Sequence, residues 1–320
     1  MRNTDRTRAA AASIAMLIPS RSFAPNPRTP GETLMTINWF PGHMNRARRE
    51  LAEALGQIDV VIELLDARLP RSSSNPMLGE LRGDKPVLTL LNKADLADPE
   101  VTQAWLTALE TQSHRTARAV DATLRASVKG VPGSCRALVP GRQGPGRRVR
   151  CMVVGIPNVG KSTLINTLLG RGIAKVGDRP AVTRHAQRFE LDDRVSLSDT
   201  PGVLWPKLED QEGAHRLAAS GAVGEAAFDT LEVATFAAGF LAHRYPEVLS
   251  ERYRIDTLPE EPLEILEAVG RRRGFLQSGG RVDLERAANT LLRELRGGTI
   301  GRISFDRPDE DGDGDGEVTD

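Results

Sequence analysis

The sequence of 320 residues contains only two cysteines, Cys135 and Cys151, and they do not form a C-x-x-C pair. We therefore expect neither a structural zinc site nor a disulfide framework, and a reducing compartment such as the cytosol fits best. A long apolar run is also missing, because the stretch at residues 9–18 is too short to span a bilayer. We expect no stable membrane association.

Residues 1–34 have features of a targeting segment, because Arg2, Arg6 and Arg8 precede the apolar stretch. Our preferred interpretation is a disordered extension, since Met35 begins a segment, MTINWFPGHM, that resembles a natural start. We expect a cytoplasmic location, and import into the mitochondrial matrix is the alternative.

The formal net charge of zero conceals an acidic end. Residues 306–320 contain eight acidic residues and one arginine, and such a segment cannot bury enough apolar surface to fold. We predict an acidic disordered tail. A calcium-binding loop of the EF-hand type is a poor alternative, because no Gly-x5-Glu pattern or flanking helices follow. The remaining body is mildly basic, as in a protein that contacts nucleic acid.

The middle of the chain alternates short apolar runs with helical stretches, a pattern typical of a mostly parallel α/β sheet with helices on both faces. Strands are predicted at residues 58–65, 86–91, 116–120, 149–154, 187–191 and 194–197. Helices are predicted at residues 45–55, 101–111, 123–137, 161–169, 231–243, 263–269 and 282–296. We therefore predict an α/β domain at 35–206 and a small all-helical domain at 207–305.

The strongest motif is GIPNVGKS at residues 155–162, a complete G-x-x-x-x-G-K-[ST] between an apolar strand and a helix. Glycines let backbone N–H groups converge on phosphate oxygens, and the helix N-terminus adds positive potential. Lys161 is expected to reach the β- and γ-phosphates, and the Ser162 hydroxyl to ligate Mg²⁺. The residues expected to contact the nucleotide here are Asn158, Val159, Gly160, Lys161, Ser162 and Thr163.

The segment NKAD at residues 92–95 matches N-K-x-D, the element by which GTPases select guanine. The Asp95 carboxylate can accept two hydrogen bonds from guanine N1–H and the exocyclic amine, a pair that adenine cannot supply. Asn92 is expected to support the loop, and Lys93 to lie across the face of the base. Beside the P-loop, this motif predicts an enzyme that hydrolyses GTP to GDP and phosphate.

A third motif, DTPG at residues 199–202, follows a predicted strand and matches D-x-x-G. Asp199 is expected to hold Mg²⁺ through water, and the Gly202 N–H to sense the γ-phosphate. Thr183 lies in the preceding stretch, placed like the switch threonine that closes on Mg²⁺ in the triphosphate state. A plain loop threonine is the alternative.

The motifs occur in a circularly permuted order, because N-K-x-D precedes the P-loop and ordinary GTPases have the reverse. Placing residues 149–205 before 58–138 restores the usual succession, so the sheet can be unchanged while its chain ends move. The fifth element, which backs the guanine, would then fall at Asp121 and Ala122, a weak match. D-x-x-G also leads directly into the helical region, which should therefore sense loss of the γ-phosphate.

The chain resembles the ribosome biogenesis GTPase A (YlqF) family in its permuted motif order and in three segments: WFPGHM at 39–44, DAR at 66–68 and DTPGVLWP at 199–206. The resemblance covers about residues 37–305. It implies a circularly permuted P-loop GTPase that assists late maturation of the large ribosomal subunit. Such a protein binds the precursor particle and its rRNA in the GTP state and leaves after hydrolysis. We expect a monomer that does not bind DNA.

Two further roles are implied by this resemblance. Val203 stands where most GTPases have a catalytic glutamine, and the family's candidate for orienting the attacking water is the histidine of FPGHM, His43 here. Contact with rRNA and local packing are the alternatives for His43, and His185 is a weaker catalytic candidate. The P-loop asparagine that holds K⁺ in the family matches Asn158.

Clusters of arginine support an RNA partner, since they can neutralise phosphates. They occur at residues 46–49, 136–150, 271–273 and 281. One alternative function is a GTP-dependent switch that acts on a protein partner. Another is a permuted GTPase of small-subunit maturation. That group typically carries a zinc-binding C-terminal domain, and the cysteine count argues against it.

Overall fold

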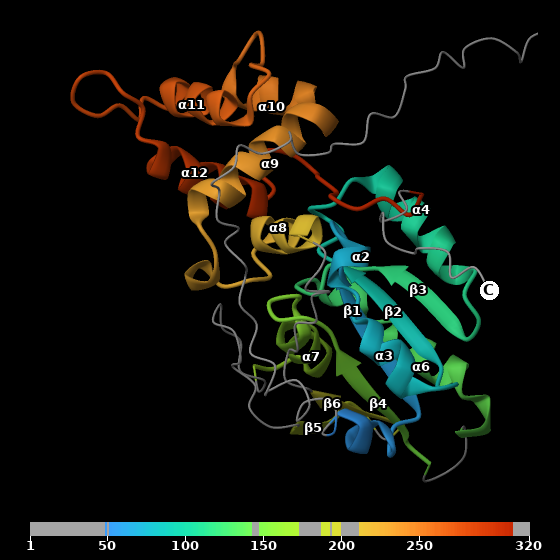
Figure 1. The fold of residues 1–320 in the computed structure, drawn as a ribbon. Helices are drawn as coiled ribbons and strands as arrows, with labels where there is room; N and C mark the ends of the chain where they lie inside the picture. Colours follow the sequence, from blue (N-terminus) through green and yellow to red (C-terminus); the bar gives the residue numbers. More distant parts are fainter. Residues whose placement is uncertain are drawn as a thin grey trace, which may run out of the picture. The chain divides into compact units, whose positions relative to one another are not determined.

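The computed structural model describes residues 49, 51–142, 147–172, 187–192, 194–199 and 211–309. Within these ranges the chain forms a six-stranded sheet in the order β3-β2-β1-β4-β6-β5 (Figure 1). All neighbouring strands pair in parallel except β5 and β6, which are antiparallel. The strands are β1 (Val60–Asp66), β2 (Val87–Asn92), β3 (Arg115–Ala119), β4 (Val149–Val154), β5 (Gln187–Glu190) and β6 (Val195–Asp199).

Helices cover both faces of the sheet, so every residue of β1 is buried. Ile62 and Leu64 share a cluster with residues of α6 and α7, whereas Val61 packs with α3 and Leu65 with α4. Successive residues of a strand point to opposite faces, which explains why β1 and β2 are mostly apolar rather than alternating. Glu63 and Thr89 are buried polar exceptions inside these strands. The helices of this part are α2 (Pro70–Ser73), α3 (Pro76–Arg82), α4 (Pro99–Glu110), α5 (Arg125–Val128), α6 (Val131–Leu138) and α7 (Lys161–Leu169).

The predicted α/β class with a helical C-terminal region is confirmed, and each predicted strand begins and ends within a few residues of an observed one. The prediction of one helix at 123–137 was wrong. The structure has α5 and α6 instead, because Gly130 caps α6 and Pro132 in its first turn has no N–H to continue a preceding helix. The short helices α2 and α3 were not predicted; each begins at a proline.

Helices dominate from residue 211 onward. They are α8 (Gln211–Ser220), the 3-10 helix η2 (Glu225–Ala227), α9 (Thr230–Arg244), α10 (Pro246–Tyr253), α11 (Pro262–Arg272) and α12 (Leu284–Arg296). α9 is the centre of this group, since it contacts α8, α10, α11 and α12. Asp229 caps α9 and Asp283 caps α12 through their side chains, and Gly297 is the C-cap of α12. Among the described helices, none combines the length and the apolar character needed to cross a membrane.

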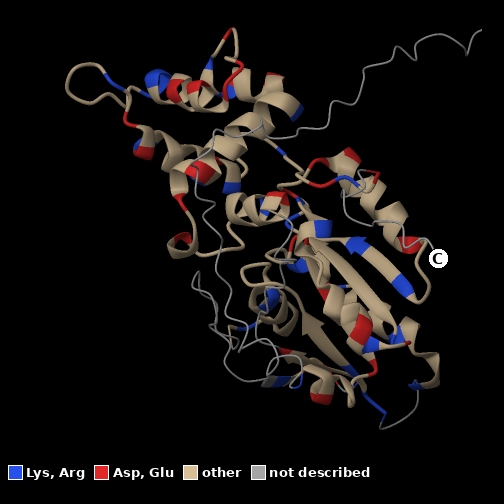
Figure 2. Ribbon diagram, viewed as in Figure 1, with Lys and Arg blue, Asp and Glu red and all other residues tan. Residues whose placement is uncertain are grey.

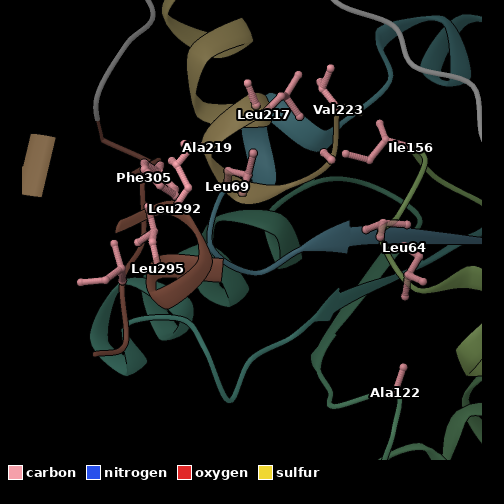
Figure 3. Packing of buried hydrophobic residues seen from close by; sticks show 14 of the residues in the cluster. Leu64, Leu69, Ala122, Ile156, Leu217, Ala219, Val223, Leu292, Leu295 and Phe305 are labelled. Carbon is pink, nitrogen blue, oxygen red and sulfur yellow. The ribbon is translucent and has the colours of Figure 1, made fainter. Parts of the chain in front are cut away.

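One hydrophobic cluster extends from the sheet into the helices (Figure 3). It contains Leu64 of β1, Leu69, Leu217 of α8, Leu292 of α12 and Phe305. The helical part is therefore packed on the α/β part through a shared core. The domain boundaries predicted after residues 34 and 206 lie outside the described residues and stay predictions.

The predicted start of the acidic tail needs a correction at Asp306, which is completely buried. Its carboxylate accepts hydrogen bonds from the Ser72 N–H (2.7 Å) and hydroxyl (3.0 Å) and pairs with Arg216 at 2.8 Å. Composition over a window cannot distinguish this partnered carboxylate from the acidic residues that follow it. Residues 310–320 lie outside the described residues.

Candidate nucleotide-binding site

The described motif residues lie together at the carboxyl ends of the adjacent parallel strands. Asp66 ends β1 opposite Asn92, which ends β2. Asp199 ends β6 opposite Val153 of β4, and the P-loop begins directly after β4 at Gly155. Ligands of open α/β sheets bind outside the carboxyl ends of the strands. The permuted chain thus brings its separated motifs to the place where a nucleotide is expected.

Two glycines of the P-loop lie where no side chain fits. A Cβ on Gly155 would lie 2.5 Å from the Leu64 carbonyl oxygen of β1. A Cβ on Gly160 would lie 2.4 Å from Nδ2 of Asn92, and Gly160 also has a φ of +106°. Asn158 has a left-handed φ of 55° as well, a conformation that is rare outside glycine and concentrates at functional sites. The loop is therefore pressed closely against β1 and the N-K-x-D loop.

Lys161 begins α7 and is almost completely buried. Its ammonium donates to the carbonyl oxygens of Gly155 (3.0 Å) and Ile156 (2.8 Å). Burial lowers the pKa of Lys161 to about 8, although the charge of Asp199 acts in the opposite direction. A charged group in so dry a position needs an anionic partner, and phosphate oxygens in a P-loop supply one.

Asn92 joins three of the predicted elements. Its amide nitrogen donates to the Val159 carbonyl of the P-loop at 2.7 Å, and its amide oxygen accepts the Ala122 N–H at 2.8 Å. The carboxylate of Asp121 accepts the N–H of Thr123 at 2.8 Å, which shapes the turn at this position. The weakly matched fifth element is thus placed next to the N-K-x-D loop, and that loop next to the P-loop.

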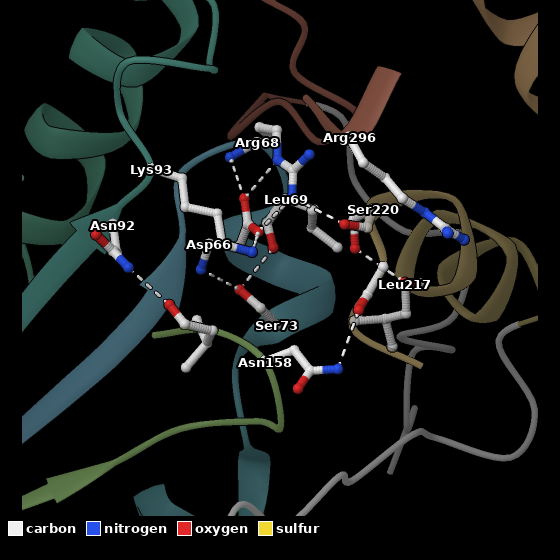
Figure 4. A network of polar contacts seen from close by, with 12 residues as sticks. Asp66, Arg68, Leu69, Ser73, Asn92, Lys93, Asn158, Leu217, Ser220 and Arg296 are labelled. Carbon is white, nitrogen blue, oxygen red and sulfur yellow. Dashed lines mark hydrogen bonds and ion pairs between the residues drawn. The ribbon is translucent and has the colours of Figure 1, made fainter. Parts of the chain in front are cut away.

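Lys93 and Asp95 extend from the same loop. Lys93 has a left-handed φ of 61°, and Asp95 is exposed. The Lys93 ammonium lies 2.9 Å from the carboxylate of Asp66, a partner that the sequence did not predict (Figure 4).

Asp66 is the centre of a buried charge network (Figure 4). Its carboxylate accepts from Nε (2.9 Å), Nη2 (2.7 Å) and the backbone N–H (3.0 Å) of Arg68 as well as from Lys93. Burial by itself raises the pKa of Asp66, but the charges and hydrogen bonds of Arg68 and Lys93 outweigh it and hold that pKa well below its usual value. The sequence indicates DAR only as a family feature, because the contact of Asp66 with Lys93 joins residues 27 positions apart in the chain.

The site also contacts the end of α8. Arg68 Nη2 donates to the Ser220 carbonyl at 3.0 Å, and the Asn158 amide nitrogen donates to the Gly221 carbonyl at 3.2 Å. These contacts connect the DAR segment and the P-loop directly to the helical part. The sequence predicted such a connection through residues 203–208, which lie outside the described residues.

The side chains present fit a hard cation such as Mg²⁺. Asp199 is buried at the end of β6, and Ser162 lies half-buried in the first turn of α7. Carboxylate and hydroxyl oxygens of this kind are the ligands that Mg²⁺ prefers. The other predicted participants, His43, Thr183 and Gly202, and the weaker candidate His185, lie outside the described residues.

Comparison with known proteins agrees with this geometry. A family model described as "50S ribosome-binding GTPase" matches residues 150–237. "Ribosome biogenesis GTPase A" of Priestia megaterium is 46% identical over 86% of this chain and 98% of its own length. The protein of that name from Bacillus cereus is 44% identical over 87% of this chain and 96% of its own length.

A solved structure of GNP-bound YlqF from T. maritima superposes with a TM-score of 0.58 at 27% identity. The match covers 83% of this chain and 99% of the other. The predicted family resemblance is thereby confirmed over most of both chains. This chain is a GTPase of ribosome biogenesis and belongs to the ribosome biogenesis GTPase A (YlqF) family.

Proposed function

We propose that the protein assists late maturation of the large ribosomal subunit, binding the precursor particle in its GTP state and leaving after hydrolysis. The observation that carries the GTPase site is the hydrogen bond from Asn92 to Val159, which ties the N-K-x-D loop to the P-loop. The matching family model is described as a 50S ribosome-binding GTPase, which supports the large subunit as the target. A cytoplasmic location and a monomeric state are part of this proposal, with the mitochondrial matrix as the alternative location.

In this proposal each motif residue has one task. Asp95 selects guanine, Asn92 holds the loop, and Asp121 and Ala122 back the base. Lys161 and the backbone of the P-loop bind the phosphates, while Mg²⁺, when bound, neutralises the β- and γ-phosphate oxygens. The residues assigned to Mg²⁺ are Ser162, Thr183 and Asp199, and Gly202 is assigned to the γ-phosphate.

His43 remains our candidate for orienting the attacking water, because Val203 cannot do so. The amide oxygen of Asn158 is the atom that would hold K⁺, since the amide nitrogen already donates to Gly221. A monovalent cation held at this position would stabilise the charge that develops on the phosphates. A comparison of GTP turnover in K⁺ and in Na⁺ tests the assignment, and equal turnover contradicts it.

Acidic neighbours balance part of the charge of the arginine clusters that we propose as rRNA contacts. In the 136–150 cluster, Arg142 and Arg150 both pair with Asp59, at 2.9 and 3.0 Å, and Arg148 pairs with Glu190. Much of that positive charge is therefore balanced inside the protein. On α11 the acidic residues precede Arg271 and Arg272, which lie in the last turn (Figure 2). Arg271 pairs with Glu267 at 3.5 Å and Arg272 with Asp256 at 3.7 Å. Both clusters are thus partly balanced by acidic neighbours, and exposed arginines such as Arg271 and Arg281 support our proposal of an rRNA contact.

The experiment that tests the proposal is sedimentation of the protein with purified large ribosomal subunits, in GDP and in a non-hydrolysable GTP analogue. We expect at least about fivefold tighter binding with the analogue, the lower range of typical coupling between two sites. Small subunits serve as the control particle. Equal sedimentation in both nucleotides, or equal binding to both particles, contradicts the proposal.

A further inference from the structure

The segment that follows α12 lies along the loop that carries Asp95. We call residues 298–306 the C-terminal strap. The guanidinium of Arg302 donates from Nη2 to the Ala94 carbonyl and from Nε to the Ala97 carbonyl, both at 2.8 Å. The Ile303 N–H donates to the Leu96 carbonyl at 2.9 Å. Three of the carbonyls next to Asp95 are therefore held by a segment about 200 residues away in the chain.

The contact continues at the start of α4. The Asp98 N–H donates to the Ser304 hydroxyl at 3.1 Å. The Tyr245 hydroxyl donates to the Ser304 carbonyl (3.1 Å), accepts the Ser304 N–H (3.1 Å) and lies 3.3 Å from the Asp98 carboxylate. The strap is thereby connected to the end of α9 as well as to the loop.

The strap is fixed at its far end, so it can transmit force to the loop. The Phe305 N–H donates to the Arg68 carbonyl at 2.6 Å, and the Phe305 side chain is buried in the shared core. Asp306 is held by Ser72 and Arg216, and its carbonyl accepts the Trp105 indole N–H at 3.1 Å. A strap anchored on both sides restrains the backbone between Ala94 and Asp98 more than solvent would.

We propose that the C-terminal strap, through Arg302, positions Asp95 and so sets how strongly the protein discriminates guanine from other purines. Arg302 is a positioning residue in this scheme, because it touches the backbone on both sides of Asp95 and not the base. The inference rests on the proposed contact between Asp95 and guanine. A ribosomal particle that shifts α12 or the strap would then change the affinity for guanine nucleotide. Because coupling between two sites is reciprocal, the nucleotide would change the affinity for the particle by the same factor.

If the strap only holds the fold together, removing its contacts would lower stability without changing base selection. The ratio of the dissociation constants for IDP and GDP separates the two cases, since hypoxanthine lacks the exocyclic amine of guanine. A site that pairs this amine loses about tenfold or more in affinity when the amine is missing. Asp95 must be held in place for that loss to appear in full.

The experiment measures the IDP-to-GDP ratio by calorimetry for the full chain and four variants. Arg302→Ala is expected to lower the ratio at least about threefold, because two of the carbonyl contacts beside Asp95 are lost. Arg293→Ala is the matched control: Arg293 is an exposed arginine of α12, and its removal should leave the ratio unchanged. Ser304→Ala, which removes only the acceptor of the Asp98 N–H, should lower the ratio less and serves if Arg302→Ala does not fold.

Asp95→Ala is the fourth variant and distinguishes the two ways of failing. A wild-type ratio in Arg302→Ala and Ser304→Ala, together with a collapsed ratio in Asp95→Ala, overturns the role of the strap and leaves the guanine site intact. A wild-type ratio in Asp95→Ala overturns the proposed base contact itself.

Discussion

The two lysines of the candidate site differ in how the protein balances their charges. Lys93 forms an ion pair with the buried Asp66 at 2.9 Å. Lys161 donates to carbonyl oxygens of its own loop, and burial lowers its pKa to about 8. The Lys93 ammonium is therefore fixed by a neighbour in the protein, whereas phosphate would supply the charge partner of Lys161.

Nucleotide affinity is expected to depend on the protonation of Lys161. Its pKa is depressed, so between about pH 8 and the ordinary lysine value the folded protein binds fewer protons than the unfolded chain, and stability rises with pH. Phosphates favour the charged form, so affinity should fall as pH rises above about 8. With a pKa near 8, the expected loss between pH 7 and pH 9 is about tenfold. Titration with a fluorescent, ribose-labelled GDP measures it.

The matched variant for this prediction is Lys161→Arg, because a guanidinium stays charged throughout this pH range. We expect the variant to bind more weakly at pH 7 and to show a smaller dependence on pH. A wild-type affinity that is the same at pH 7 and pH 9 contradicts the assigned role of Lys161.

Among the elements, the P-loop and the N-K-x-D loop depend most closely on each other. Gly160 leaves space for the amide of Asn92, and that amide is held on both sides by Val159 and Ala122. Asn92 therefore cannot rotate away without breaking two hydrogen bonds in the interior. The absence of a side chain at Gly160 lets the two loops pack this closely, and the hydrogen bonds of Asn92 hold them together.

Gly160→Ala is expected to weaken GDP binding by at least about tenfold, because the new Cβ clashes with Asn92 and the left-handed φ adds strain. Fluorescence titration of GDP measures the loss. Gly79→Ala in α3 is the control, since nothing lies within 4 Å of a Cβ at Gly79. It should bind GDP like the wild type and be slightly more stable. Wild-type affinity in Gly160→Ala would contradict the close packing of the two loops.

The sequence predicted the strands and the motif loops because their signals are local. Apolar runs such as β1 and β2 are bounded by polar motif residues, and Lys161–Leu169 follows a glycine-rich loop. The division between α5 and α6 was missed because Gly130 and Pro132 lie inside an otherwise helical pattern. The strap could not be predicted at all. Its contacts join Arg302 to Ala94, which lies 208 residues earlier in the chain. Hydrogen bonds to backbone carbonyls do not depend on the side chains of the loop, so the loop sequence does not indicate them.

At the scale of the whole molecule, the helical part and the sheet share one core and several polar contacts. Phe305 and Leu217 belong to the same cluster as Leu64, and the end of α8 accepts hydrogen bonds from Arg68 and Asn158. A particle that binds the helices therefore contacts a part that is already joined to the P-loop, to DAR and, through the strap, to the guanine loop. This arrangement suits a GTPase whose nucleotide state controls binding to a large partner.

The most direct test of this account is the base preference of Asp95→Asn, measured as kcat/KM for GTP and for XTP. Xanthine carries an oxygen where guanine carries the exocyclic amine, so an amide at residue 95 can donate to it while the carboxylate repels it. We expect the variant to lose GTP hydrolysis and to gain XTP hydrolysis relative to the wild type. An Asp95→Asn variant that still prefers GTP as strongly as the wild type would contradict the assigned guanine site.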